Sequence, residues 1–159
     1  KSVWREATAN TSRLTTGNCL AARAHSKHEI EQKLLRVGYR PCTVEMVLYK
    51  LEREHLLNDA DFARQWVEAR SGRKLGRSRI AQELRRKGIG ADEAEEALSA
   101  IGEDAQLADA IALAEKAAAR AKSDEDPRKT YQRIAAMLAR RGFRWDITKE
   151  ALAQVLQAD

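Results

Sequence analysis

Apolar residues recur with helical spacing on both sides of three glycines, and this pattern organises the chain. When Gly38, Gly88 and Gly142 are superposed, apolar residues occupy the positions eight and four residues before each glycine: Ile30 and Leu34, Ile80 and Leu84, and Ile134 and Leu138. Further apolar residues lie one, ten and thirteen residues after each glycine: Tyr39, Leu48 and Leu51, then Ile89, Leu98 and Ile101, then Phe143, Leu152 and Val155. A spacing of four residues is about one helical turn, so the pattern predicts an amphipathic helix on either side of each glycine.

The residues at the ends of these segments agree with helices. Each glycine suits the left-handed position just after a helix, with the following apolar residue folding back onto that helix. Ser26 and Glu29 have the spacing of a capping box, and Asp126 before Pro127 reads as an N-cap followed by a proline at the first helical position. These signals predict helices that start at residues 27 and 127.

Longer helical stretches at 58–74 and about 104–122 link the three segments, which repeat at intervals of 50 and 54 residues. Such a period is typical of a tandem helical array. We expect an all-α, elongated array of three-helix units, with three repeats of which the last is truncated. The expected boundaries are a first unit at 18–59 that includes a helix over roughly 18–25, a second at 60–103, a third at 104–159, and a poorly ordered segment at 1–17.

Composition supports this fold class. The 159 residues are 43% hydrophobic but only 5% aromatic, with 8 Gly and 2 Pro, which disfavours β-sandwiches and barrels. No apolar run approaches the roughly 18 residues of a membrane span, and no signal-peptide pattern is visible. The two cysteines, Cys19 and Cys42, form no paired motif. We therefore expect a soluble cytoplasmic protein with reduced thiols.

Charge is unevenly distributed along the chain. The net charge is +5 overall, but it is +6 over residues 60–90, −8 over 91–126 and +4 over 127–159. Arginine outnumbers lysine by 19 to 10, and arginine is the better residue for bidentate contacts to phosphate or carboxylate. A polyanion is one plausible partner, and a mixed-sign surface also suits an acidic protein partner.

The sequence contains no recognisable set of catalytic or metal-binding residues. His25 and His28 are three residues apart, but the predicted cap at Ser26 separates them, and no cysteine or carboxylate at ligand spacing completes a metal site. No nucleophile, base and orienting carboxylate converge in the pattern, and no glycine-rich phosphate loop is present. We predict a binding protein without enzymatic activity, cofactor or metal.

The strongest candidate for binding is a basic zone from Arg70 to Lys87, where eight basic residues accompany one acidic residue, Glu83. On the helix before Gly88, Arg79 and Arg86 lie nearly opposite the apolar face and should project outwards together. The third repeat has an equivalent pair. The predicted binding residues are Arg70, Arg73, Lys74, Arg77, Arg79, Arg86, Lys87, Arg133 and Arg140. The alternative is a solvated face with internal partners, such as Arg79 with Glu83.

Two glycines lie within this zone. Gly72 and Gly76 are expected to loosen the end of the linking helix, so that Arg70, Arg73 and Lys74 extend the basic surface.

The stretches SKHEIEQKLLRVGY and LLNDADFARQWVEARSGRKLGRSRIAQELRRKGI resemble the RecX family of bacterial regulators of the RecA recombinase. The resemblance covers roughly residues 18–159. Its most specific residues are Asp59, Phe62, Ala63, Trp66, Val67, Arg70, Gly76, Ile80, Glu83, Leu84, Lys87, Gly88 and Ile89. The third repeat is the more variable part, and residues 1–17 match nothing recognisable.

The resemblance implies tandem three-helix units that bind the RecA filament on single-stranded DNA and suppress its recombinase, ATPase and co-protease activities. Such a protein modulates homologous recombination, DNA repair and the SOS response, and family members also bind single- or double-stranded DNA weakly. An alternative from another class is a DNA-binding protein that uses basic three-helix modules without contacting a recombinase. In either case we expect a monomer that does not associate with membranes.

Overall fold

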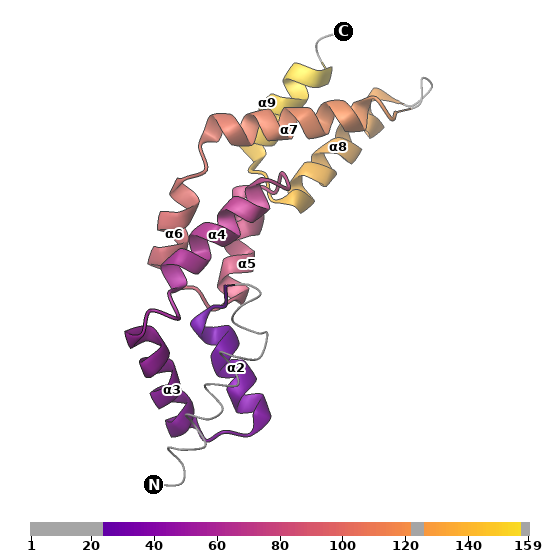
Figure 1. The fold of residues 1–159 in the computed structure, drawn as a ribbon. Helices are drawn as coiled ribbons and strands as arrows, with labels where there is room; N and C mark the ends of the chain where they lie inside the picture. Colours follow the sequence, from indigo (N-terminus) through magenta and orange to yellow (C-terminus); the bar gives the residue numbers. More distant parts are fainter. Residues whose placement is uncertain (1–23, 122–125, 157–159) are drawn as a thin grey trace.

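The computed structural model describes residues 24–121 and 126–156, which form helices joined by short turns, with no strand among them. The helices, labelled as in Figure 1, are α2 (Lys27–Val37), α3 (Pro41–Arg53), α4 (Asp59–Ser71), α5 (Arg77–Arg86), α6 (Ala91–Ser99), α7 (Glu103–Ala118), α8 (Pro127–Arg141) and α9 (Trp145–Leu156). The predicted all-α fold is confirmed. Residues 1–17, which we expect to be poorly ordered, lie outside the described ranges.

The helices form an elongated array in three groups, with α2 and α3 at one end, α4 to α6 in the middle and α7 to α9 at the other end (Figure 1). Every extensive helix–helix packing lies within one of these groups. Each group has its own hydrophobic core, and the predicted repeat positions supply the largest buried side chains: Ile30, Leu51, Ile80, Leu84, Ile134, Leu138 and Leu152. The predicted helical repeat is therefore confirmed.

The stretches predicted as linking helices open the units that follow them. Helix α4 packs on α5 and α6, and α7 packs on α8 and α9. The α7–α9 group thus contains three helices, as the α4–α6 group does. The expectation of a truncated last repeat is wrong, because the linking helix shares a core with the two helices after it.

The three glycines end their helices as predicted. Gly38, Gly88 and Gly142 have φ angles of 101°, 74° and 89°, in the left-handed region. In each turn, the N–H after the glycine donates to a carbonyl of the preceding helix at 3.1 to 3.3 Å: Tyr39 to Leu34, Ile89 to Leu84, and Phe143 to Leu138. These bonds satisfy carbonyls that have no partner within the helix.

The predicted helix starts are also confirmed. Ser26 and Glu29 form a reciprocal capping box at α2, and the Asp126 side chain accepts the Arg128 N–H at α8, which begins with Pro127. The expected helix over 18–25 falls mostly outside the described residues. Its described end, residues 24 and 25, is not helical.

Candidate functional site

Helices α5 and α8 meet end to end, and backbone hydrogen bonds hold this joint together. The Gly76 N–H donates to the Arg141 carbonyl at 2.8 Å, and the Ser78 N–H donates to the Gly142 carbonyl at 3.2 Å. The Arg77 N–H donates to the side chain of Gln106, at 2.9 Å. The first turn of α5 therefore has its otherwise unpaired N–H groups satisfied by the last unit.

Gly76 has a role that differs from the predicted one. A Cβ atom at this position would overlap the backbone of Gly142, so the two helix ends approach each other closely only because Gly76 has no side chain. The residue is buried. Gly76 therefore fixes the joint between α5 and α8, and the expectation that it loosens the chain is wrong.

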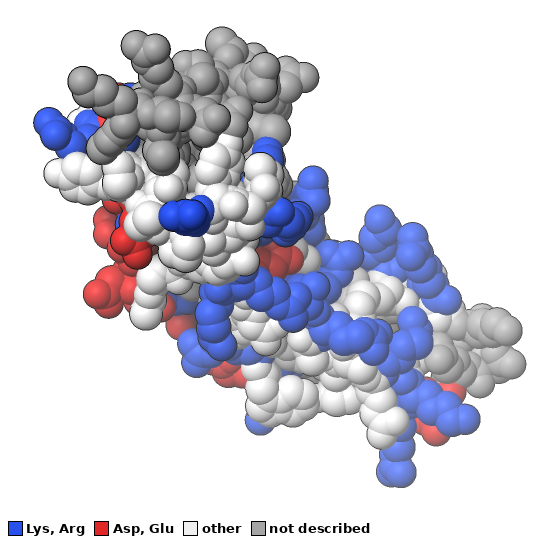
Figure 2. Space-filling view, turned by 90° about the horizontal axis from the view of Figure 1, so that it is seen from below, with Lys and Arg blue, Asp and Glu red and all other residues white. Residues whose placement is uncertain are grey.

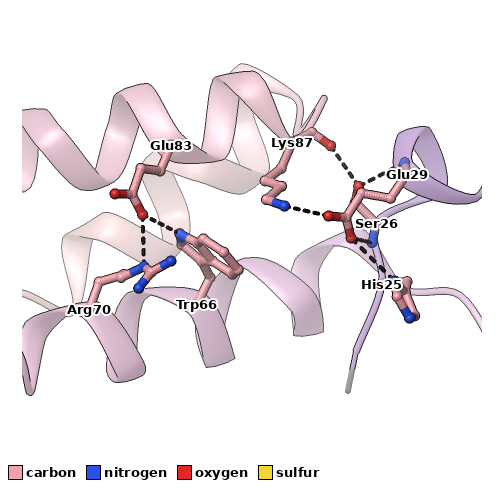
Figure 3. A network of polar contacts seen from close by, with 7 residues as sticks. All are labelled: His25, Ser26, Glu29, Trp66, Arg70, Glu83 and Lys87. Carbon is pink, nitrogen blue, oxygen red and sulfur yellow. Dashed lines mark hydrogen bonds and ion pairs between the residues drawn. The ribbon is translucent and has the colours of Figure 1, made fainter. Parts of the chain in front are cut away.

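Helix α2 meets α5 in the same orientation, but side chains hold this second joint (Figure 3). The Ser26 hydroxyl donates to the Lys87 carbonyl at 2.6 Å, and the Lys87 ammonium forms an ion pair with Glu29. At the same end of α2, the Lys27 N–H donates to the carboxylate of Asp59, the first residue of α4, at 2.9 Å. Since most of these contacts involve charged groups, this joint depends on ionisation more than the α5–α8 joint does.

The half-buried indole of Trp66 connects the α2–α5 joint to the hydrophobic core of the α4–α6 group. The Trp66 N–H donates to Glu83 at 3.1 Å, and Glu83 also pairs with Arg70 at 2.7 Å (Figure 3). The Arg70 guanidinium lies 4.3 Å from the Trp66 ring centroid, and the Lys87 ammonium lies 5.0 Å from it. Such cation–π contacts contribute about 0.5–2 kcal/mol each. Arg70 and Lys87 are therefore built into the fold.

The ionisation of two groups at this joint is shifted. Burial is the largest cause that raises the pKa of Asp59, and the Lys27 N–H that it accepts partly offsets this effect. Hydrogen bonding to Glu52 is the largest cause that raises the pKa of Lys27. The lysine is thereby held in its charged form, while the carboxylate of Asp59 is partly disfavoured.

The outward cations of α5 and α8 form the candidate binding surface, which we call the basic stripe: Arg79, Arg86, Lys129, Arg133 and Arg140. Arg86, Lys129, Arg133 and Arg140 are exposed, and the side chain of Arg79 is 42% exposed although it lies 3.6 Å from Glu83. Because α5 and α8 meet end to end, the stripe runs along one column of two helices. Figure 2 shows Lys and Arg side chains gathered over one face of the molecule.

Lys129 belongs to the basic stripe but is not among the binding residues predicted from the sequence. It lies four residues before Arg133 and therefore on the same helical face. The repeat comparison could not find it, because α8 begins about one turn earlier, relative to its glycine, than α5 does. Its i, i+4 spacing from Arg133 is the signal that identifies it.

The remaining predicted binding residues divide into two kinds. Lys74 pairs with Asp109 at 2.9 Å, and Arg77 pairs with Glu95, so both have acidic partners within the chain. Arg73 is exposed and its carbonyl accepts from the Arg141 side chain. Of these three residues, Arg73 is the one that extends the exposed basic surface across the joint.

Metal-ligand clusters and membrane-spanning helices are absent from the described ranges. No three His, Cys, Asp or Glu side chains there are placed to hold a metal ion. His25 instead lies 3.4 Å from Glu29, and His28 lies 3.5 Å from Glu31. None of the described helices has the length and apolar character needed to cross a membrane.

Comparison with known proteins shows which protein family this chain resembles. Residues 58–98 match the family model described as RecX, second three-helix domain, and residues 104–152 match that described as RecX, third three-helix domain. The chain is 38% identical over 141 residues to a protein named Regulatory protein RecX from Mycobacteroides abscessus, an alignment that covers 84% of this chain and 68% of the relative. A relative of the same name from Chlorobium limicola is 35% identical, with 87% of this chain and 85% of the relative covered.

Solved structures show the same architecture. The crystal structure of RecX from Lactobacillus salivarius superposes with a TM-score of 0.81 at 25% identity, covering 96% of both chains. A second crystal structure, of a regulatory protein RecX, superposes with a TM-score of 0.83 over 99% of this chain and 74% of the other. At 23% identity, this second likeness supports the fold alone.

Proposed function

Because the chain belongs to the RecX family, whose relatives here are named regulatory proteins, we propose that it regulates the RecA recombinase. In this proposal, the protein binds the RecA filament on single-stranded DNA and inhibits strand exchange, ATP hydrolysis and co-protease activity. It would thereby modulate homologous recombination, DNA repair and the SOS response in the cytoplasm. It acts by binding, without enzymatic chemistry, cofactor or metal.

The observation that carries the proposal is the basic stripe on an elongated array. A filament is a long repetitive partner, and an extended protein with separate cores can contact several of its protomers at once. The stripe offers exposed cations at intervals along two stacked helices, which suits a partner with repeating negative charge. Arg86 and Arg140 occupy equivalent positions in successive units, so the same contact can recur along the column.

A second candidate function rests on the same cations. Exposed arginines in a row also suit the phosphates of DNA, and most protein–DNA hydrogen bonds go to phosphate and sugar. A protein that acts through free DNA alone would coat the strand and block RecA indirectly. The two candidates differ in whether RecA itself is contacted.

ATP hydrolysis by purified RecA on single-stranded DNA, measured with and without this protein over a range of salt concentrations, separates the two. Binding through phosphate contacts weakens steeply with salt. We expect inhibition to persist at a salt concentration where this protein no longer binds free DNA. Inhibition that disappears together with free DNA binding would favour the second candidate, and no inhibition at any salt concentration would contradict both.

A further inference from the structure

One large aromatic side chain on the last unit has no explanation in the fold. Trp145, the first residue of α9, is 63% exposed. Within the described ranges, its ring makes no hydrogen bond or aromatic contact. Tryptophan normally buries a large apolar area and finds a partner for its indole N–H. The exposure of Trp145 therefore points to a partner outside this chain.

The repeat shows that this position does not require an aromatic residue. The residues three positions after Gly38 and Gly88, equivalent to Trp145, are Pro41 and Ala91. Each of them also begins a helix. Trp66, by contrast, stacks on Phe62 with ring centroids 5.5 Å apart and has partners for its N–H and its π face. Trp66 is therefore held by contacts within the fold, whereas the ring of Trp145 makes no such contact with the residues that the structure describes.

The segment that precedes Trp145 in the sequence is basic. Arg140 and Arg141 close the preceding helix, and Arg140 is exposed. A separation of five residues places Trp145 within about 17 Å of Arg140 along the chain. The adjacent Arg144 pairs with Asp146 at 2.8 Å and lies 3.6 Å from Glu103, yet its side chain is still 56% exposed.

The turn that leads to Trp145 crosses the middle of the basic stripe. The turn at Gly142, three residues before it, touches Arg79 at the start of α5. Stripe residues of α8 therefore lie on one side of this turn along the column, and those of α5 lie on the other. A strand that follows the stripe passes the turn that leads to the exposed indole.

We propose that Trp145 stacks on a base of single-stranded DNA whose phosphates follow the basic stripe. This inference rests on the proposed function only in assuming that the stripe faces a nucleic-acid strand. A basic groove combined with an exposed aromatic ring is the arrangement that binds single strands without sequence preference. Duplex DNA offers the same phosphates, but its bases are stacked inside the helix and leave no free face for the indole.

The test compares binding of a labelled oligothymidylate and of a duplex of the same length by fluorescence anisotropy. The variants are Trp145→Ala, Trp145→Phe and a matched control, Tyr49→Ala. Tyr49 is also 63% exposed, but it lies on α3, away from the stripe. Circular dichroism confirms that each variant is folded.

We expect Trp145→Ala to weaken single-strand binding by about fivefold or more, which is the lower end of base-stacking contributions. The slope of log affinity against log salt should stay unchanged, because no phosphate contact is lost. Trp145→Phe should retain most of the affinity, and duplex binding should change no more than it does in Tyr49→Ala. Binding of oligothymidylate should also quench tryptophan emission in the parent more than in Trp145→Phe.

Two results would overturn the inference. In one, Trp145→Ala binds the single strand as well as Tyr49→Ala does. In the other, it loses duplex and single-strand binding equally, which would indicate a general structural effect. Neither result bears on whether the parent inhibits RecA, so failure of this inference is distinguishable from failure of the proposed function.

Discussion

At the scale of single residues, the glycines after α2 and α5 form a natural comparison. Gly38 and Gly88 both have positive φ angles, but a Cβ at Gly38 would meet nothing within 4 Å, whereas a Cβ at Gly88 would overlap the side chain of His28. Both sites therefore disfavour a branched side chain through backbone strain. Only Gly88 adds a clash across the joint between α2 and α5.

This difference predicts unequal costs for the same substitution. Gly38→Val should lower the free energy of unfolding by about 1–2 kcal/mol, the strain of a left-handed residue. Gly88→Val should lower the free energy of unfolding by about 1–3 kcal/mol more than Gly38→Val does, because it also overpacks the contact with His28. Urea denaturation of the two variants measures this, and equal losses would show that the contact with His28 is unimportant.

A second prediction for a single residue concerns the effect of the Asp59 charge on stability. Because burial raises its pKa, its charged form is less favourable in the folded protein than in the unfolded chain. Asp59→Asn keeps an oxygen that can accept the Lys27 N–H but removes this charge. We expect the variant to be slightly more stable than the parent at pH 7, by less than about 1 kcal/mol.

The sign of the pH dependence provides the check. As pH falls through the raised pKa of Asp59, the folded parent takes up a proton that the unfolded chain still lacks, and the parent gains stability. The advantage of Asp59→Asn should therefore shrink from pH 7 to pH 4 in urea denaturation. An advantage that grows over this interval would mean that the Asp59 charge stabilises the fold.

At the scale of helices, local patterns were predictable and contacts between units were not. The capping box at Ser26 and the left-handed turns depend on residues only a few positions apart, so their spacing is visible in the sequence. The hydrogen bond from Ser26 to Lys87 joins residues 61 positions apart. The meeting of Gly76 with Gly142 is likewise a long-range contact that no periodicity encodes.

The candidate site shows the same division. Helical spacing correctly placed Arg86 and Arg140 on exposed faces. It could not separate them from Arg70 and Lys87, because a basic residue has the same charge whether it faces solvent or an internal carboxylate. Only the positions of Glu29, Glu83 and Trp66 in space make that distinction.

The ion pair between Lys87 and Glu29 predicts how the α2–α5 joint responds to mutation. Lys87→Met keeps much of the apolar stem but leaves Glu29, which is 17% exposed, without its ammonium partner. A hydrogen bond to a charged group contributes about 1.5–3 kcal/mol. Amides of α2 and α3 should therefore exchange with solvent about tenfold faster or more, while those of α7 to α9 should be unchanged.

Arg86→Met is the matched control, because it removes the exposed cation that precedes Lys87 in the sequence. Hydrogen exchange followed by mass spectrometry resolves the helices. If Lys87→Met leaves exchange in α2 and α3 as slow as Arg86→Met does, the ion pair does not hold this joint. In that case the hydrogen bonds of Ser26 and Asp59 stabilise the joint.

At the scale of the whole molecule, the separate cores predict an extended particle. A compact globule of 159 residues has a radius of gyration of about 15 Å. Small-angle scattering at low protein concentration should give a clearly larger value at the mass of a monomer. A value near 15 Å would mean that the units fold back on one another in solution.

The basic stripe is the face that we propose binds the filament. The sharpest test reverses Arg86 and Arg140 together, because both are exposed, whereas Arg79 borders Gly142 and pairs with Glu83. The control reverses Arg36 and Arg53, two exposed arginines of α2 and α3, and makes the same change in net charge. Both variants should keep parental helix content, since exposed substitutions usually change stability by less than about 0.5 kcal/mol.

The measurement is inhibition of RecA ATP hydrolysis on single-stranded DNA by the parent, by Arg86→Glu/Arg140→Glu and by Arg36→Glu/Arg53→Glu. We predict that the stripe variant inhibits much more weakly than the parent, while the control inhibits nearly as well as the parent. If the stripe variant inhibits RecA as strongly as the control does, the cations of α5 and α8 are a solvated helix surface and the filament is bound elsewhere.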